Sequence, residues 1–267
     1  MNHNLTQILK VAEGRYFSPE ETALFEAYYQ QLPARLSHYK VLEKAEASVI
    51  KDTLKALFQG DPLMADMADS EIKGQRDMAY LYRAASLAMV QCDLDALAEK
   101  ASFVFEIFEQ LKFPAANLER AYDLLRQRIA QQVPKSTWDA AEPYFNVLSA
   151  TRLRYYRELQ DKMGTITQSL LEQMYTVNPQ LKALNQDEHC KKDFHSLISA
   201  CAVAMLSQDA STVNDRKHWL YAYFKTLRFD INNVYDTYRT LPDILQSHLS
   251  AEAQEAFEPY VKLLAQP

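Results

Sequence analysis

The second half of this chain repeats the first half, and that repeat limits the folds open to it. Residues 77–148 align with residues 193–264 at a constant offset of 116 positions, with 17 identities in 72 positions. Most other apolar positions are matched conservatively, and residues 34–39 resemble residues 151–156 at an offset of 117. Chance similarity between helical segments seldom keeps one register over such a length. The sequence therefore predicts a tandem duplication, in which residues 1–33 have no counterpart.

Helical spacing of apolar residues is nearly continuous, and no alternating segments bounded by turn signals indicate strands. Ser-Pro-Glu-Glu at 18–21 has the form of a capping box with proline at the first helical position, which predicts a helix start. We expect this helix to end near Leu32, before Pro33, and a long helix to follow from Ala34 to Phe58, stopped near Gly-Asp-Pro at 60–62. The further helices are expected at about 73–91, 94–112, 115–132, 136–149, 150–175, 190–207, 211–228, 230–247 and 251–265.

Each repeat is about 115 residues long, whereas the helix pairs of solenoids run to about 34–47 residues. Six or so helices of unequal length favour a compact globin-like packing instead. The sequence thus predicts an all-α fold of two tandem globin-like units. An N-terminal helix pair would occupy residues 1–33, the first unit residues 34–149 and the second unit residues 150–267.

Composition disfavours several classes of function. A net charge of −6 and a pI near 5.6 are unlike the basic surface of a non-specific nucleic-acid binder. The four glycines are dispersed, so the chain has neither a phosphate-binding loop nor a nucleophile elbow. No apolar run reaches the roughly 18 residues of a membrane span, and the N-terminus lacks the features of a signal peptide. We therefore expect a cytoplasmic protein.

The run His-Cys-Lys-Lys-Asp at 189–193 gathers a thiol, an imidazole, two amines and a carboxylate. Its histidine and cysteine lack the ligand spacing of a zinc site, and no histidine recurs in both repeats as a haem ligand would. Nothing in the chain has the arrangement of a catalytic site, so we expect neither a metal nor an enzyme. Cys190 is then either an exposed thiol at a helix start, or a reactive one whose pKa is lowered by the two lysines and the helix dipole.

Aromatic and small apolar residues supply the expected cores. Phenylalanines at 103, 105 and 108 correspond to Trp219, Tyr221 and Phe224 in the second repeat. We expect these stripes to be chiefly core. Cys92 and Cys201 lie in alanine-rich apolar helices and are expected to be small core residues.

Several motifs in order resemble one known family. They are Ala-Glu-Gly-Arg-Tyr-Phe-Ser-Pro-Glu-Glu at 12–21, Gly-Gln-Arg-Asp at 74–77, Tyr-Leu-Tyr-Arg at 80–83 and Ala-Glu-Pro-Tyr-Phe at 141–145. This order resembles the phycobilisome protein family, the globin-like phycobiliprotein subunits of cyanobacteria and red algae. The resemblance covers the first unit and, through the repeat, the globin part of the second.

The resemblance implies a ligand, a linear tetrapyrrole or bilin. In that family a cysteine forms a thioether to the bilin, an arginine pairs with a propionate, and an aspartate accepts hydrogen bonds from the inner pyrrole nitrogens. In the first unit Arg76 and Asp77 match, but Gly74 stands where the cysteine belongs, so binding there would be non-covalent. In the second unit Cys190 and Asp193 match, and Lys192 replaces the arginine. For the aromatic stripes, the alternative to a core is that they line a pigment pocket.

By the same resemblance, we expect a non-enzymatic phycobilisome-related protein that binds phycobilisome subunits or photosystem components. The missing cysteine favours an accessory role, in assembly, linkage, turnover or bilin handling, at the cytoplasmic face of the thylakoid membrane. Peripheral association with thylakoid complexes and self-association fit this expectation, and nucleic acid does not. Two alternatives remain: a light-harvesting or photosensory subunit with a bilin on Cys190, and a pigment-free globin-like signalling module.

Overall fold

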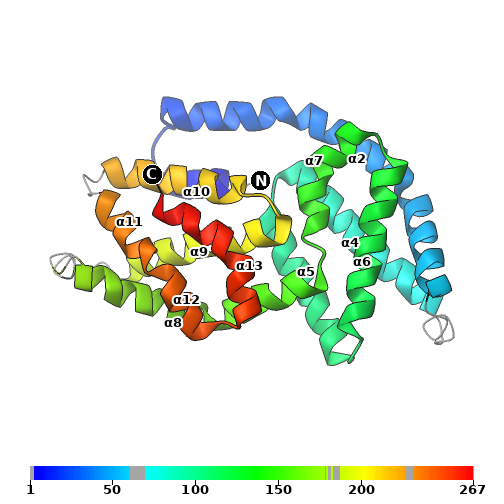
Figure 1. Cartoon of the computed structure of the whole chain (residues 1–267). Helices are drawn as coiled ribbons and strands as arrows, with labels where there is room; N and C mark the ends of the chain where they lie inside the picture. The colour runs from blue at the N-terminus through cyan, green and yellow to red at the C-terminus, as the bar shows by residue number, and fades with distance from the viewer. Residues whose placement is uncertain are drawn as a thin grey trace. The chain divides into compact units, whose positions relative to one another are not determined.

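The computed structural model describes the backbone of residues 3–60, 70–177, 179, 182, 187–226 and 231–266. Every regular element in these ranges is a helix, and none of them contains a strand (Figure 1). The chain divides into two compact units, residues 1–151 and 152–267. The predicted all-α fold of two tandem units is therefore confirmed.

The first unit is built around one long helix. It contains α1 (His3–Val11), α2 (Pro19–Gly60), α4 (Ser70–Gln91), α5 (Leu94–Gln110), α6 (Ala115–Gln132) and α7 (Lys135–Asn146). Helix α2 packs on α4, α6 and α7, and α4 also packs on α5 and α7. The core of this unit lies between these helices.

The second unit repeats this order. It contains most of α8 (Ala150–Val177), followed by α9 (Asp187–Ser207), α10 (Ser211–Thr226), α11 (Ile231–Arg239), α12 (Leu241–His248), α13 (Ala251–Val261) and the 3₁₀ helix η2 (Lys262–Ala265). Helix α9 packs on α10 and α13, and η2 packs on α10, α11 and α13. At the offset of 116, α4 corresponds to α9, α5 to α10, and α7 to α13.

The capping box at 18–21 forms as predicted. The Ser18 hydroxyl accepts from the backbone N–H of Glu21, and the Glu21 carboxylate accepts from the backbone N–H of Ser18, at 3.2 and 2.8 Å. Arg15 adds a contact that the motif does not contain, because its guanidinium donates to both Glu21 oxygens, at 2.8 and 2.6 Å. These contacts lower the pKa of Glu21 to about 2, chiefly through Arg15. A charged, fully bonded carboxylate therefore fixes the start of α2.

The expected helix end at Leu32 is wrong, because α2 continues through Pro33. A proline inside a helix removes one backbone hydrogen bond and usually bends the helix. Here the buried guanidinium of Arg35, two residues after Pro33, donates to the carbonyls of Tyr28 and Val90, at 2.9 and 3.0 Å, and lies 4.4 Å from the centre of the Tyr28 ring. Its positive charge also suits the C-terminal end of α4, where Val90 lies. Figure 1 shows α2 changing direction along its length.

The helix expected at 230–247 is two helices, α11 and α12, with residue 230 outside the described ranges. Pro242 lies at the start of α12, where its missing N–H costs nothing, so the chain begins a new helix there. The corresponding residue in the first unit is Arg126, and α6 is unbroken. The other helix boundaries fall within a few residues of expectation. The helix end expected at 60–62 lies partly outside the described residues, because residues 61 and 62 are not described.

The ends of the two units are held in different ways. In the first unit, the Arg126 guanidinium donates to the carbonyl of Leu148. In the second unit, the buried ammonium of Lys217 donates to the carbonyls of Leu263 and Gln266, each at 2.9 Å, and burial lowers its pKa. Lys217 thus ties the final segment to α10, which the sequence pattern did not indicate.

The expected cores are confirmed only in part. Phe105 and Tyr221 are buried, but Phe103 is 63% exposed, so the stripe on α5 is not wholly a core stripe. Phe224 lies outside the residues whose side chains are described. Cys201 is buried, whereas Cys92 is only half-buried and lies just past the end of α4 with a φ of 50°. Its counterpart Gln208 follows α9 with a φ of 58°.

Candidate functional site

The candidate site of the first unit lies on the second and third turns of α4. Gly74 is half-buried there, and a Cβ atom added to it would stand 2.9 Å from Leu54 Cδ2 and 4.0 Å from Phe58 Cζ. A contact under 3.0 Å forces something to move. The position where the resemblance expects a cysteine is therefore filled from α2.

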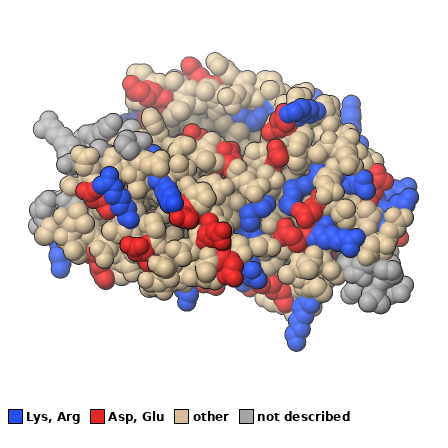
Figure 2. All heavy atoms as spheres, in the orientation of Figure 1, with Lys and Arg blue, Asp and Glu red and all other residues tan. Residues whose placement is uncertain are grey.

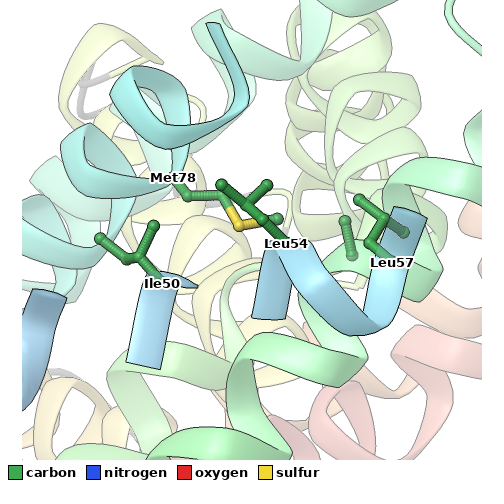
Figure 3. Packing of buried hydrophobic residues seen from close by; sticks show 5 residues of the cluster. Ile50, Leu54, Leu57 and Met78 are labelled. Atoms are coloured by element: carbon green, nitrogen blue, oxygen red, sulfur yellow. The ribbon is translucent and has the colours of Figure 1, made fainter. Parts of the chain in front are cut away.

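Leu54 has little freedom to move away from Gly74. It is 5% exposed and belongs to a buried cluster with Ile50, Leu57, Met78 and Ala121, against which Phe58 also packs. Figure 3 shows Leu54 reaching from α2 toward Met78 of α4, with Ile50 and Leu57 on either side. Side chains in such a cluster cannot shift without loss of contacts, because protein interiors are close-packed. The space beside Gly74 is thus part of the core.

Arg76 and Asp77, the two residues of this unit that match the family pattern, pair with each other. The distance from Arg76 Nε to Asp77 Oδ1 is 2.8 Å, and the arginine side chain is 73% exposed. Behind them, the buried hydroxyl of Tyr122 has no hydrogen-bond partner within the described part of the chain. Burial raises the pKa of Tyr122, and the nearby Glu119 and Asp77 carboxylates raise it further.

The corresponding residues of the second unit lie in the first two turns of α9. Cys190 and Asp193 are both half-buried, and a spacing of three residues places them on one face of the helix. Lys192 is exposed, and the Lys191 ammonium lies 3.5 Å from a Glu188 oxygen. The thiol and the carboxylate are therefore brought together, while the lysine that replaces the family's arginine points elsewhere.

One contact here has no equivalent among the described residues of the first unit. The hydroxyl of Tyr175, near the end of α8, donates to the Asp187 carboxylate one turn before Cys190. Desolvation and this hydrogen bond raise the pKa of Tyr175 to about 12. At the offset of 117 Tyr175 corresponds to Phe58, and Leu171 corresponds to Leu54. The repeat register shows that these positions correspond, but not which contacts their side chains make.

The electrostatics of the second unit contradict the idea of a reactive thiolate. Burial raises the pKa of Cys190 to about 11, and the Asp193 and Asp187 carboxylates raise it further. The lysines expected to lower this pKa do not oppose the effect, because one faces Glu188 and the other faces solvent. Of the two alternatives for Cys190, a raised pKa favours the unreactive thiol over the reactive one.

Asp193 is the strained member of this site. Within the described residues its carboxylate has neither a hydrogen-bond donor nor a cation within ion-pair distance. Burial raises its pKa to about 6, and the nearby His189 opposes this only in part. The buried Tyr238, the counterpart of Tyr122, lies close enough for Asp193 to raise its pKa. Each unit therefore places a buried tyrosine beside the repeated aspartate.

Two further observations concern other classes of site. Within the described ranges, no three His, Cys, Asp or Glu side chains are placed to hold one metal ion. No helix of the described chain has the length and apolar character that a membrane span requires. Both statements leave the function open.

The fold and the repeated sites define a tandem pair of globin-like helical units. Comparison with known families gives the class a name: the model described as "Phycobilisome protein" matches residues 11–151 and again residues 148–267. The chain therefore belongs to the phycobilisome protein family, and the predicted membership and duplication are confirmed. Among known proteins, it is similar to allophycocyanin subunit beta-18 of Cyanophora paradoxa. The two are 28% identical over 120 residues, which are 42% of this chain and 71% of the relative.

Proposed function

We propose that this protein is a non-enzymatic accessory component of the phycobilisome system that binds phycobilisome subunits or photosystem components. The observation that carries the proposal is the asymmetry of the two candidate sites. In the first unit Leu54 fills the place of an attachment cysteine, and Arg76 is engaged by Asp77. A chain that has packed one of its two sites into its core is poorly suited to dense pigment loading, and fits assembly, linkage, turnover or bilin handling better.

The first unit does not fit a bilin. Attachment needs a thiol where Gly74 lies, and even a Cβ atom there would be 2.9 Å from Leu54. Non-covalent binding needs Arg76 to leave Asp77 and Asp77 to face the pyrrole nitrogens. We therefore assign no bilin to this unit, and its Arg76–Asp77 pair serves the surface of α4.

The second unit fits a bilin in part, and this supports a second candidate function, a bilin-carrying subunit. A carboxylate that is largely removed from water without a partner is costly, and the half-buried Asp193 is in that condition within the described part of the chain. A bilin, when bound, would supply pyrrole N–H groups as donors. Cys190 on the same face would supply the thiol, and Lys192 would have to turn inward to meet a propionate. Because the thiol is protonated at neutral pH, attachment would depend on a base that removes its proton.

Pigment loading is tested by expressing the chain together with enzymes of bilin synthesis. Denatured protein would be separated on a gel and examined for zinc-enhanced bilin fluorescence. The accessory proposal expects no covalent pigment on the wild-type chain or on Cys92→Ser. A fluorescent band that Cys190→Ser removes, and that Cys92→Ser keeps, would overturn that expectation in favour of the bilin-carrying subunit.

Partner binding is tested separately, with purified phycobilisomes and purified allophycocyanin. The accessory proposal expects the unpigmented chain to sediment with intact phycobilisomes or to bind allophycocyanin in surface plasmon resonance. Absence of binding to both, together with absence of pigment, would contradict it and favour a pigment-free signalling module. We also propose a location in the cytoplasm at the face of the thylakoid membrane, which fractionation of cells carrying a tagged chain would test.

A further inference from the structure

A row of lysines lies along the outer side of α2. Lys40, Lys44, Lys51 and Lys55 are all exposed, and none of them lies within ion-pair distance of a carboxylate in the part of the chain that the structure describes. The whole chain carries a net charge of −6. These four lysines therefore make one side of α2 positively charged on a chain that is negative overall. In Figure 2, Lys and Arg side chains appear at several places over the region of α2 and α6.

The spacing places these lysines on one face. At about 100° per residue, positions 40, 44, 51 and 55 fall within an arc of about 60°. At about 1.5 Å per residue they extend over about 22 Å. On the opposite side of the helix Leu42, Val49 and Thr53 are buried. We call the surface formed by these four lysines the lysine face, and it points away from the core of the first unit.

The same arc continues toward the N-terminus with apolar residues. Tyr29 and Leu36 are 59% and 41% exposed, and both fall near the line of the lysines on the helix surface. Fewer acidic residues than lysines border this arc of α2. Glu43 lies on one side of it, and Asp52 on the other side accepts a hydrogen bond of 2.7 Å from Gln132. One helix thus presents two apolar side chains followed by four cations.

The residue types indicate which partner this face suits. Lysine is depleted in protein–protein interfaces, where arginine and aromatic anchors dominate. Stacking of single-stranded nucleic acid needs aromatic residues among the cations, and the lysine face has none between Lys40 and Lys55. A diffuse anionic surface is different, because lysine acts there as a flexible point charge and needs no fixed geometry. Polybasic helix faces with exposed apolar neighbours are typical of binding to anionic lipid headgroups.

We propose that the lysine face of α2 binds the anionic surface of a lipid bilayer, with Tyr29 and Leu36 entering the headgroup layer. The contact is peripheral, reversible and dependent on salt, because it rests on exposed charges. It orients the first unit with the outer side of α2 against the membrane. This inference is independent of whether either unit carries a pigment.

The test is sedimentation of the full-length chain with vesicles. Vesicles of phosphatidylglycerol mixed with phosphatidylcholine should bind the protein, and vesicles of phosphatidylcholine alone should not. Each lysine contributes roughly fivefold to such binding, so the variant with Lys40, Lys44, Lys51 and Lys55 all changed to Gln should bind more than a hundredfold more weakly. In about 1 M salt, where the Debye length is about 3 Å, wild-type binding should also disappear.

A matched control separates the lysine face from net charge. Changing Lys100, Lys135, Lys162 and Lys262 to Gln removes the same charge from exposed positions outside α2 and should leave most of the vesicle binding. A second variant, Tyr29→Ser with Leu36→Ser, should weaken binding severalfold while keeping its salt dependence. Circular dichroism of each variant checks that the helices remain.

Three results would overturn the proposal. The first is equal loss of vesicle binding in the two lysine variants, which would assign the effect to net charge. The second is binding to phosphatidylcholine alone that ignores salt. The third is displacement from anionic vesicles by double-stranded DNA at equal phosphate concentration, which would point to a nucleic-acid partner instead.

Discussion

The starts of α4 and α9 descend from one repeated segment and have diverged in opposite directions. In α4 the position of the thiol is a glycine under Leu54, and Asp77 is neutralised by Arg76 at 2.8 Å. In α9 the thiol is present, and the half-buried Asp193 carboxylate has no hydrogen-bond or ion-pair partner among the described residues. In the first site, core packing fills the position of the missing thiol. The second site keeps its polar groups, and these lower the stability of the folded second unit. Carboxyl groups whose pKa is raised by burial cluster at functional sites.

The packing of the first site can be broken by adding the missing side chain. Gly74→Cys should lower the free energy of unfolding of the first unit by about 1–3 kcal/mol, because Leu54 must leave its place in the cluster. The measurement is urea unfolding followed by the fluorescence of Trp138 in a Trp219→Phe background, so that only the first unit is reported.

Gly164 provides the matched control. It is an exposed helical glycine with nothing within 4 Å of an added Cβ atom, so Gly164→Ala should stabilise its helix by about 0.5–1 kcal/mol. The Gly74→Cys cost should also shrink when Leu54→Ala is made first. If Gly74→Cys is neutral in the wild-type background, the first site is not closed by packing.

The destabilising carboxylate of the second site can be removed by replacing Asp193. Its pKa is raised from 3.8 to about 6, so the folded state holds a proton that the unfolded state releases between about pH 4 and pH 6. This carboxyl therefore favours unfolding increasingly as the pH rises through that window. Asp193→Asn should stabilise the second unit by about 1–2 kcal/mol at pH 7 and by little near pH 4. Trp219 fluorescence in a Trp138→Phe background reports the second unit.

Asp77→Asn is the counterpart in the first unit. It removes an exposed ion pair and should cost about 0–1 kcal/mol at pH 7, without the gain expected at Asp193. A stabilisation confined to Asp193→Asn would sharpen the comparison. A loss of stability in Asp193→Asn at pH 7 would show instead that the carboxylate has a partner.

The thiol of the second site should react slowly. In the Cys92→Ser variant, whose remaining Cys201 is buried, iodoacetamide should alkylate Cys190 about tenfold more slowly at pH 8 than it alkylates the same protein in urea. The rate should still rise above pH 10, because the pKa is about 11. Mass spectrometry of the alkylated peptide gives the rate. A plateau near pH 9 would contradict the buried thiol.

The smallest expected effect compares the helix ends, where the two units are alike. Cys92 and Gln208 both follow a helix with positive φ, in the position that glycine usually takes. Asp93 and Asp209 donate their N–H to the carbonyls of Ala88 and Ala204, at 3.0 and 3.1 Å. Cys92→Gly and Gln208→Gly should each stabilise by about 0.5–1 kcal/mol.

Gln91→Gly, one residue earlier and still helical, should destabilise by a similar amount and serves as the control. Thermal unfolding followed by circular dichroism measures all three variants. Opposite signs for Cys92→Gly and Gln208→Gly would show that the helix ends have diverged as the sites have.

The repeat and the helical periodicity made the fold predictable, because both follow from local spacing. The capping box at 18–21 was readable for the same reason: its hydrogen bonds join residues three apart. The passage of α2 through Pro33 was not, since it depends on Arg35 reaching Val90, 55 positions away. Sequence patterns that span a few residues cannot report such a contact.

The candidate sites show the same division. The repeat alignment sets Gly74 opposite Cys190, but it gave no sign that Leu54 packs beside Gly74 or that Tyr175 donates to Asp187. The charge of the two lysines beside Cys190 suggested a lowered pKa, and burial decided the opposite. The effect of burial on a charge depends on neighbours from other helices, which a single sequence does not place.

The hydrogen bonds of the Arg35 guanidinium also have a mechanical consequence. They link residues on both sides of Pro33 and tie this part of α2 to the end of α4. These contacts should oppose bending of α2 at Pro33, so we expect the segment before Pro33 to move together with the first unit. A partner bound to this segment would therefore also pull on the first unit. Loss of the Arg35 guanidinium would leave the two parts of α2 connected by the helix backbone alone.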